Sequence, residues 1–275
     1  MQGIDKQFPG VLANQGIHFD VRAGEIHALL GENGAGKTTL MNILCGLYEP
    51  DAGQIRLFGE PVRFRSPREA IAAGIGMVHQ HFMLVDSFTV AENIILGQTG
   101  RTLLREAPRQ LHRHLQNLAD QYGLKMNPAI PVWQLSVGEQ QRVEILKALY
   151  RHARVLILDE PTAVLTPQEA DDLLITLQML AAQGTTIIFI SHKLREVMSV
   201  CHRVTVLRDG RTVGTVTTQE CSEQQLAEMM VGRAVNLRRQ PDASKALPLQ
   251  EQEPALHLKQ LSVLNDRHLP AIQDL

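Results

Sequence analysis

The eight residues from 31 to 38 constrain this chain more than any other stretch. Gly31, Glu32, Asn33, Gly34, Ala35, Gly36, Lys37 and Thr38 match the pattern GxxxxGK[ST] in full. The apolar run before them, residues 26–30, suits a buried strand, and residues 39–44 can continue as a helix. Strand, glycine loop and helix form the context that this pattern requires. The sequence therefore favours a phosphate-binding loop over a glycine turn that only caps a helix.

The residue types of the loop explain how it would bind phosphate. Glycines let the backbone curl so that successive N–H groups point at phosphate oxygens, and the helix N-terminus adds a favourable dipole. Lys37 is then expected to reach the β- and γ-phosphates of a nucleotide. The Thr38 hydroxyl is expected to ligate Mg²⁺.

A second apolar run, residues 155–158, ends in two adjacent carboxylates, Asp159 and Glu160. Ligands of open α/β sheets bind at the carboxyl ends of the strands, so the pair is expected near the glycine loop. Asp159 would hold the magnesium through its coordination shell, and Glu160 would polarise the attacking water as general base. By itself such a pair is more often a helix cap or a solvated turn. Its combination with the glycine loop is what favours the catalytic interpretation.

Composition narrows the remaining possibilities. The 275 residues are 44% hydrophobic and 20% charged, which suits one large folded α/β domain, or one domain and a fragment. A net charge of −2 gives no strong field toward nucleic acid, and we expect no nucleic-acid partner. Three cysteines without CxxC spacing argue against disulfides and zinc and favour a reducing cytosol. No run approaches eighteen apolar residues, so we expect a peripheral role at any membrane.

Between the glycine loop and the acidic pair lies Leu135-Ser136-Val137-Gly138-Glu139-Gln140-Gln141-Arg142. This stretch resembles the signature of ABC ATPases, LSGGQ followed by Gln-Arg, which distinguishes them from other phosphate-loop proteins. A serine and a glycine at a helix start offer a hydroxyl and N–H groups to an anion. In this family the anion is the γ-phosphate bound on the opposing domain. Ser136 can also be an ordinary N-cap with Glu139 completing a capping box, and both interpretations can hold together.

Three further residues resemble family landmarks in the expected order. Gln80 resembles the glutamine that contacts magnesium and couples to the membrane partner. His192 follows an apolar strand and resembles the histidine that contacts the γ-phosphate, although a lone histidine there is more often a surface residue. Phe8 matches the aromatic position that stacks on adenine, or it could fill core.

The resemblance thus implies a full set of residues for binding ATP and Mg²⁺. It implies as catalytic residues Lys37, Glu160 and His192. It implies as metal ligands Thr38, Gln80 and Asp159. It implies as nucleotide contacts Phe8, the loop residues 31–38, Thr39, Gln80, Asp159 and the signature residues Ser136, Gly138 and Glu139.

Two positions depart from the family pattern. Val137 replaces a glycine of the signature, which keeps the N–H but adds a Cβ near the phosphate. Thr166 stands where most ABC proteins have aspartate in the loop after Glu160, which bears on coupling between domains through this loop. Neither change removes a group that hydrolysis needs.

Three stretches of sequence resemble the ATP-binding proteins of simple sugar and nucleoside importers in particular, namely residues 135–142, 162–166 and 229–233. Residues 80–85 are more similar to the nucleoside branch. Such proteins usually carry two ATPase domains in tandem, so the chain is expected to be the N-terminal half. The resemblance implies ATP hydrolysis at a head-to-tail interface with a second ABC domain, from the same full-length chain or a second copy. It also implies integral membrane permease subunits as partners, a solute-binding protein as an indirect partner, and a peripheral place at the cytoplasmic face of the inner membrane.

The expected fold is α/β, a phosphate-loop NTPase of the ABC type. Residues 1–234 would form the ATPase domain, with a core of 1–85 and 155–234 and an inserted helical subdomain at about 86–154, where helical leucine spacing replaces β-rich runs. An Asp209-Gly210 turn predicts an antiparallel hairpin at the edge of the core. Residues 235–254 have linker composition, and 255–275 would be the truncated start of a second ABC domain, or else a docking tail.

Two rival functions remain open at this point. The first is a soluble ABC ATPase outside transport, such as a ribosome-associated factor, although those tend to carry long charged insertions and none is visible here. The second is a regulatory module that holds nucleotide without hydrolysing it, against which the intact Lys37, Asp159 and Glu160 argue. If a second domain completes the ATP site, the isolated chain should bind ATP and hydrolyse it poorly.

Overall fold

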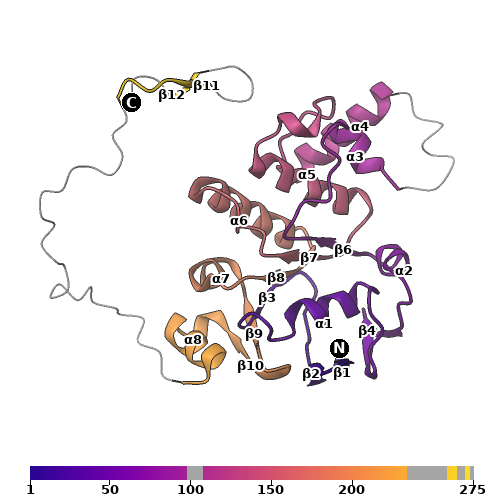
Figure 1. The fold of residues 1–275 in the computed structure, drawn as a ribbon. Helices are drawn as coiled ribbons and strands as arrows, with labels where there is room; N and C mark the ends of the chain where they lie inside the picture. The colour runs from indigo at the N-terminus through magenta and orange to yellow at the C-terminus, as the bar shows by residue number, and fades with distance from the viewer. Residues whose placement is uncertain (98–107, 234–258, 265–269, 273–275) are drawn as a thin grey trace, which may run out of the picture. The chain divides into compact units, whose positions relative to one another are not determined.

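The computed structural model describes residues 1–97, 108–233, 259–264 and 270–272. Its contacts divide the chain into two units, Met1–Val235 and Asn236–Leu275. The first unit is a layered α/β structure in which strands lie between helices (Figure 1).

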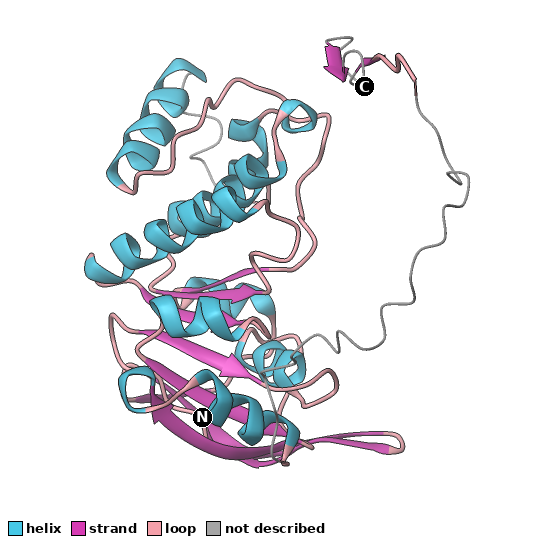
Figure 2. Ribbon diagram, turned by 90° about the vertical axis from the view of Figure 1, so that its left-hand side faces the viewer, coloured by secondary structure: helices cyan, strands magenta, loops and turns pink. Residues whose placement is uncertain are grey.

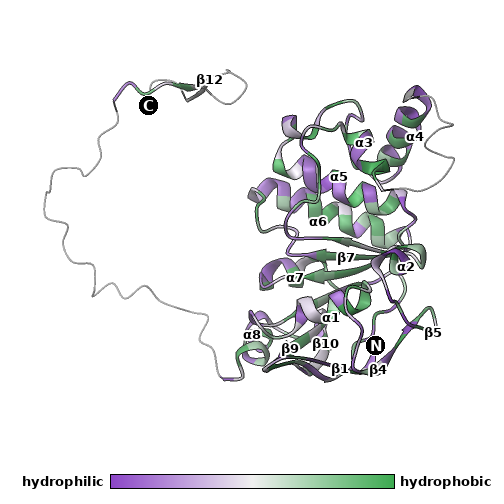
Figure 3. Ribbon diagram, turned by 45° about the vertical axis from the view of Figure 1, so that its right-hand side comes forward, coloured by the Kyte–Doolittle hydropathy of each residue, from purple (hydrophilic) through white to green (hydrophobic). Residues whose placement is uncertain are grey.

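One mixed sheet of six strands forms the centre of the first unit, in the order β10-β9-β3-β8-β7-β6. Its strands are β3 (Ile26–Leu30), β6 (Ile75–Val78), β7 (Val155–Asp159), β8 (Thr186–Ile190), β9 (Arg203–Arg208) and β10 (Arg211–Thr217). β10 pairs antiparallel with β9, and the other pairings are parallel. Every residue of β3 and β8 is buried, because strands covered on both faces have no solvent side. This burial explains why both strands are mostly apolar, and strands at the centre of the unit are coloured as hydrophobic in Figure 3.

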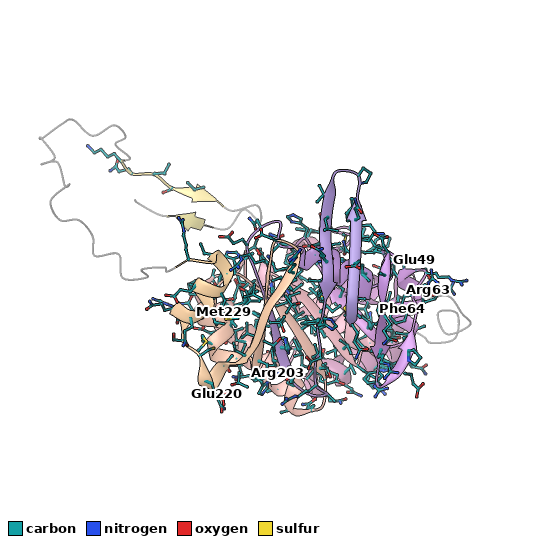
Figure 4. The ribbon with its side chains drawn as sticks, turned by 90° about the horizontal axis from the view of Figure 1, so that it is seen from below. Glu49, Arg63, Phe64, Arg203, Glu220 and Met229 are labelled. Atoms are coloured by element: carbon teal, nitrogen blue, oxygen red, sulfur yellow. The ribbon has the colours of Figure 1, made fainter. Side chains whose placement is uncertain are left out.

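A separate antiparallel sheet of four strands has the order β2-β1-β4-β5. Its strands are β1 (Gln2–Phe8), β2 (Val11–Ile17), β4 (Ala52–Leu57) and β5 (Glu60–Val62). An exposed ion pair flanks its outer hairpin, where Arg63 Nη2 donates to Glu49 Oε2 at 2.8 Å (Figure 4).

Eight α-helices and two short 3₁₀ turns complete the described part of the first unit. The α-helices are α1 (Lys37–Leu44), α2 (Pro67–Ala72), α3 (Val90–Ile95), α4 (Pro108–Gln121), α5 (Val137–Tyr150), α6 (Pro167–Ala182), α7 (Leu194–Val200) and α8 (Glu223–Val231). The 3₁₀ turns are η1 (Val132–Gln134) and η2 (Thr218–Glu220). The described elements between β6 and β7 are all helical, and they gather at one end of the unit, away from the antiparallel sheet (Figure 2).

The six-stranded sheet separates two hydrophobic cores, and alternate residues of its strands point into each. Leu156 and Leu158 of β7 pack into the core that the helices α3 to α8 cover. Val155 and Ile157 pack into the other core, beneath α1 and the antiparallel sheet. The strand period of two residues therefore serves both faces at once.

A polar network lies where β3 and β9 begin, at the amino edge of the sheet. His27 is fully buried, with Nδ1 at 3.1 Å from Glu25 Oε1 and Nε2 at 2.8 Å from Thr205 Oγ1. Arg203, labelled in Figure 4, donates to Asp20 at 3.0 Å and to Glu25 at 3.2 Å. Burial alone would raise the pKa of Glu25, but hydrogen bonds from His27 and from the Arg22 N–H outweigh it and lower that pKa.

The predicted α/β fold with an antiparallel edge is confirmed. The glycine loop follows β3 and leads into α1, and the acidic pair lies at the end of β7. The Asp209-Gly210 turn joins β9 to β10 as predicted. The predicted linker, 235–254, lies outside the described residues. In the second unit the structure describes one antiparallel pair, β11 (Val263–Leu264) with β12 (Pro270–Ile272), so most of the strand-like stretch from 255 onward also lies outside the description.

Within the described residues, no helix combines the length and the apolar character needed to cross a membrane.

Candidate nucleotide site at the carboxyl edge of the sheet

Strand register brings four chain segments to one edge of the sheet. Leu29 of β3 pairs with Ile190 of β8, which pairs with Asp159 of β7. Because these strands are parallel, the residues that follow them leave the sheet at the same level. The glycine loop, Glu160 and His192 therefore come from adjacent strand ends, and Gln80 follows β6 beside them.

Two glycines of the loop have no room for a side chain. A Cβ on Gly31 would lie 2.5 Å from the carbonyl oxygen of Leu207 in β9. Gly36 has a φ of 95° and caps α1, and a Cβ there would lie 2.5 Å from the Asn14 amide nitrogen. The loop thus owes its shape to close backbone approach as well as to the φ angles that glycine permits.

Asn14 of β2 ties the antiparallel sheet to the glycine loop. Its side chain is fully buried, and Nδ2 donates to the Gly36 carbonyl oxygen at 3.2 Å. Its Oδ1 is buried without a hydrogen-bond partner in the described structure. A flipped amide would point Oδ1 at the Gly36 carbonyl oxygen, and two acceptors cannot form a hydrogen bond. Asn14 therefore helps position the start of α1.

The Lys37 ammonium lies inside the loop, with its side chain pointing back toward the strand. Nζ donates to the carbonyl oxygens of Gly31 at 2.8 Å and Glu32 at 3.0 Å, and the residue is only 8% exposed. Burial lowers the pKa of this ammonium, while the carboxylates of Glu160 and Asp159 act to raise it. A buried cation inside the loop is suited to an anion, and the nearby carboxylates are suited to a metal ion that binds with it.

The two carboxylates of the site have different surroundings. Burial raises the pKa of Asp159, and the adjacent Glu160 raises it further, against the opposing charges of His79 and Lys37. Glu160 has a φ of 46°, in the left-handed region, and its N–H donates to the Ile190 carbonyl oxygen at 2.9 Å. His192 Nδ1 lies 2.9 Å from Glu160 Oε1. The Glu160 side chain is 17% exposed and that of His192 57%, so Glu160 is sheltered while His192 is open to solvent.

These residues line one cleft of about 520 Å³. Besides Val11 and Ala13, the lining comprises Phe8, Asn33, Gly34, Gly36, Lys37, Thr38, Thr39, Gln80, Asp159 and Glu160. Phe8 meets the Tyr48 ring edge to face, with the centroids 5.3 Å apart. Most of the nucleotide contacts implied by the sequence therefore meet in one place, and His192 joins them through Glu160.

The donor set of the cleft fits a magnesium ion. Thr38, Gln80 and Asp159 offer a hydroxyl, an amide and a carboxylate oxygen, and Mg²⁺ takes oxygen ligands. The described residues contain no group of three or more His, Cys, Asp or Glu placed to hold a metal. A site with a single carboxylate suits an ion that takes its other ligands from phosphates and water, as Mg²⁺ usually does.

The signature residues lie elsewhere, at the start of α5. Ser136 caps this helix, since Oγ accepts from the Glu139 N–H at 3.2 Å and the Glu139 carboxylate accepts from the Ser136 N–H at 2.7 Å. The capping box is therefore present. Ser136, Gly138 and Glu139 do not belong to the lining of the cleft around Lys37. One described domain thus carries two separate groups of predicted nucleotide contacts.

The sequence interpretation missed two residues that contact predicted site residues. Asn14 lies within an unremarkable strand, and only the fold brings it to Gly36. Glu169 shows a local pattern, because Thr166 and Glu169 have capping-box spacing, but its contact with Ser136 spans 33 positions.

The fold and the cleft together define a phosphate-loop nucleotide-binding domain. The sequence profile described as ABC transporter matches residues 14–163. The chain is 49% identical to the glucose import ATP-binding protein TsgD13 of Haloferax volcanii, over 100% of this chain and 54% of that protein. It is 48% identical to the guanosine import ATP-binding protein NupO of Bacillus subtilis, over 100% of this chain and 53% of that protein. This chain belongs to the ABC transporter family of ATP-binding proteins.

Solved structures agree on the fold. The chain is similar to cbiO1 from Clostridium perfringens, part of the ABC transporter complex cbiONQ, with 29% identity and a TM-score of 0.70 over 86% of this chain and 94% of that one. An ATP-binding cassette of an ABC transporter in its ADP conformation superposes with a TM-score of 0.73 at 23% identity, over 84% of this chain and 97% of that one. The chain spans about half the length of the curated relatives it matches.

Proposed function

We propose that this chain binds and hydrolyses Mg-ATP to power an importer of nucleosides or simple sugars. The observation that carries the proposal is the cleft lined by Lys37, Asp159 and Glu160, with His192 hydrogen bonded to Glu160. Family membership and the import proteins among the relatives support it. They do not favour a ribosome-associated factor.

Each residue of the cleft has a distinct task under this proposal. The glycine loop and Lys37 bind the phosphates, and Phe8 contacts the base. Thr38, Gln80 and Asp159 hold Mg²⁺, which neutralises charge on the phosphates. Glu160 accepts the proton of the attacking water, and His192 keeps the Glu160 carboxylate in position.

The separation of the two groups of contacts supports a head-to-tail arrangement. Ser136, Gly138 and Glu139 do not line the cleft of their own domain, and under this proposal they serve the nucleotide held by a second ABC domain. That domain belongs to the full-length chain or to another copy. ATP between the two faces would draw the domains together, and hydrolysis would release them.

A groove between the core and α5 is the proposed contact surface for the permease. Its volume is about 240 Å³, and it is lined in part by Leu47, Ile71 and Met83, which are 49%, 36% and 61% exposed. Exposed apolar side chains around a groove mark a protein contact. The loop that follows Gln80 borders this groove, where Met83 hydrogen bonds to Glu144 and Lys147 of α5. Contact here would place the protein at the cytoplasmic face of the membrane and give the Gln80 loop a route to the permease.

The solute class rests on the names of the relatives alone. They include import proteins for glucose, guanosine and ribose. Uptake of labelled nucleosides and of labelled simple sugars, glucose and ribose among them, by cells that lack this chain would separate the two classes. Loss of neither uptake would refute both.

The first experiment measures Mg-ATP hydrolysis per molecule at increasing protein concentration, with Glu160→Gln as the blank. Because a second domain completes the site, we expect a low rate that rises with concentration and disappears in the blank. ATP binding should persist in Glu160→Gln. Full turnover in this variant, or robust turnover in a dilute monomer, would contradict the proposal.

A further inference from the structure

The carboxylate of Glu169, on α6, lies against the start of α5. Ser136 Oγ donates to Glu169 Oε1 at 3.3 Å, and the same carboxylate lies against Gly138. A Cβ built on Gly138 would lie 2.6 Å from Glu169 Oε1 and 2.8 Å from its carboxyl carbon. Only glycine at position 138 therefore lets the Glu169 carboxylate come this close to the start of α5 without being displaced.

The position of Glu169 is fixed by its own helix as well. Thr166 caps α6, its Oγ1 accepts from the Glu169 N–H at 3.3 Å, and Glu169 Oε2 accepts from the Thr166 N–H at 3.1 Å. The second carboxylate oxygen is free to reach across to α5. Hydrogen bonds from the Thr166 N–H and from the hydroxyls of Thr166 and Ser136, with the nearby Gly138 N–H acting in the same direction, hold the pKa of Glu169 below its usual range. The group is thus held as an anion.

Glu169 uses the Ser136 hydroxyl and occupies the space beside Gly138, both of which the proposed function assigns to phosphate. The Ser136 hydroxyl cannot donate to this carboxylate and to a phosphate of a second domain in one geometry. Two anions at one helix start would also repel each other.

We propose that the Glu169 carboxylate competes with the phosphate of the second domain for the signature: it engages the Ser136 hydroxyl, lies against Gly138 and must give way before the phosphate binds. This inference rests on the proposed function. It links two elements, because the loop from Glu160 to Thr166 leads directly into α6, and α6 reaches the signature through Glu169. Displacement of this carboxylate is the local step that makes the signature able to bind.

The test reads the signature directly. The chain, labelled with ¹⁵N, is titrated with inorganic phosphate while the amide signal of Gly138 is followed. Glu169→Gln retains the volume and the capping box, since glutamine serves at this helix position, but it removes the charge. A charge-assisted hydrogen bond is about twice as strong as a neutral one, so we expect phosphate to bind at Gly138 about tenfold more tightly in this variant.

Two controls make the result specific. Asp172→Asn removes the same charge from an exposed position of α6 and should leave the titration at Gly138 unchanged. The amide of Gly34 reports phosphate in the glycine loop and should respond equally in all three proteins. A thermal melt of Glu169→Gln confirms that the variant folds.

Equal or weaker binding at Gly138 in Glu169→Gln would overturn the inference. If this variant does not fold, Glu169→Asp replaces it, because the charge stays while the side chain loses one methylene and no longer reaches α5. Phosphate should then bind at Gly138 more tightly than in the unaltered chain, and equal binding would again overturn the inference. The titration needs no turnover, so it can fail while hydrolysis through Glu160 succeeds, and the reverse also holds.

Discussion

Similar charged side chains lie at both edges of the six-stranded sheet, and their partners differ. At the amino edge, Glu25 accepts hydrogen bonds from His27, Arg203 and the Arg22 N–H, and its pKa is lowered. At the carboxyl edge, Asp159 lies beside another carboxylate, and its pKa is raised.

This difference separates stability from function. Charges that are fully paired stabilise the fold, whereas charges left short of partners gain them only when a ligand binds. We therefore expect substitutions at the carboxyl edge to alter activity and binding, and substitutions at the amino edge to alter folding.

The largest expected effect concerns His192. Its hydrogen bond holds Glu160, and misplacement of a catalytic group by about 1 Å can cost about a hundredfold in rate. We expect His192→Ala to lower the maximal rate of Mg-ATP hydrolysis about a hundredfold, with an unchanged melting temperature because the side chain is exposed. His18→Ala, at an exposed position just after β2, is the control. An unchanged rate would mean that Glu160 needs no such partner.

Lys37→Ala should weaken ATP binding about thirtyfold, as expected when one hydrogen bond between charged groups is lost. Calorimetric titration with Mg-ATP measures the change. Lys125→Ala removes an exposed cation elsewhere and should bind ATP normally. The stability of Lys37→Ala should not fall, since it removes a buried charge. A large loss of stability with normal ATP affinity would mean that Lys37 stabilises the fold and does not bind the nucleotide.

Glu25→Gln tests the opposite edge. We expect the free energy of unfolding to fall by about 1–2 kcal/mol at neutral pH, because the variant weakens hydrogen bonds to buried partners. The lowered pKa of Glu25 means that its stabilisation is present above the ordinary carboxyl range and is lost as pH falls through the folded-state pKa. Denaturant unfolding at several pH values should show the gap to the unaltered chain closing on acidification. ATP affinity should not change, and Glu60→Gln serves as the exposed control.

Asp159→Asn should give the smallest effect, with the opposite sign. Its raised pKa means that the ionised group destabilises the fold, and this cost appears as pH rises through the folded-state pKa. We expect the variant to be more stable by about 0.5 kcal/mol at neutral pH and to show little difference in acid. Thermal melts at both pH values measure this, with Asp172→Asn alongside. A loss of stability at neutral pH would remove the contrast between the edges.

The sequence predicted what depends on local pattern. β7 is apolar on both faces and ends in two carboxylates, and strand geometry alone sends those carboxylates to the edge of the glycine loop. The turn at Asp209-Gly210 was equally predictable, because this residue pair favours a hairpin turn.

What the sequence did not reveal depends on distant partners. His27 looked like one more residue of an apolar run, yet it is satisfied by Thr205, 178 positions away. Asn14 and Glu169 gained their roles from Gly36 and Ser136, at separations of 22 and 33 positions. No local spacing specifies such contacts, since they arise from how whole elements dock.

The chain passes from Ser136 through α5 and directly into β7, which ends at Asp159. The helix alone extends for about 21 Å, because each of its residues adds about 1.5 Å. One helix, a short turn and one strand therefore connect the donors offered to a neighbour's nucleotide with Glu160, the base proposed for the domain's own. Under the proposed function, a displacement of the signature is transmitted to Glu160 through α5, the short turn after Tyr150 and β7. In two such domains facing each other, binding or hydrolysis of one nucleotide would therefore affect the site of the other.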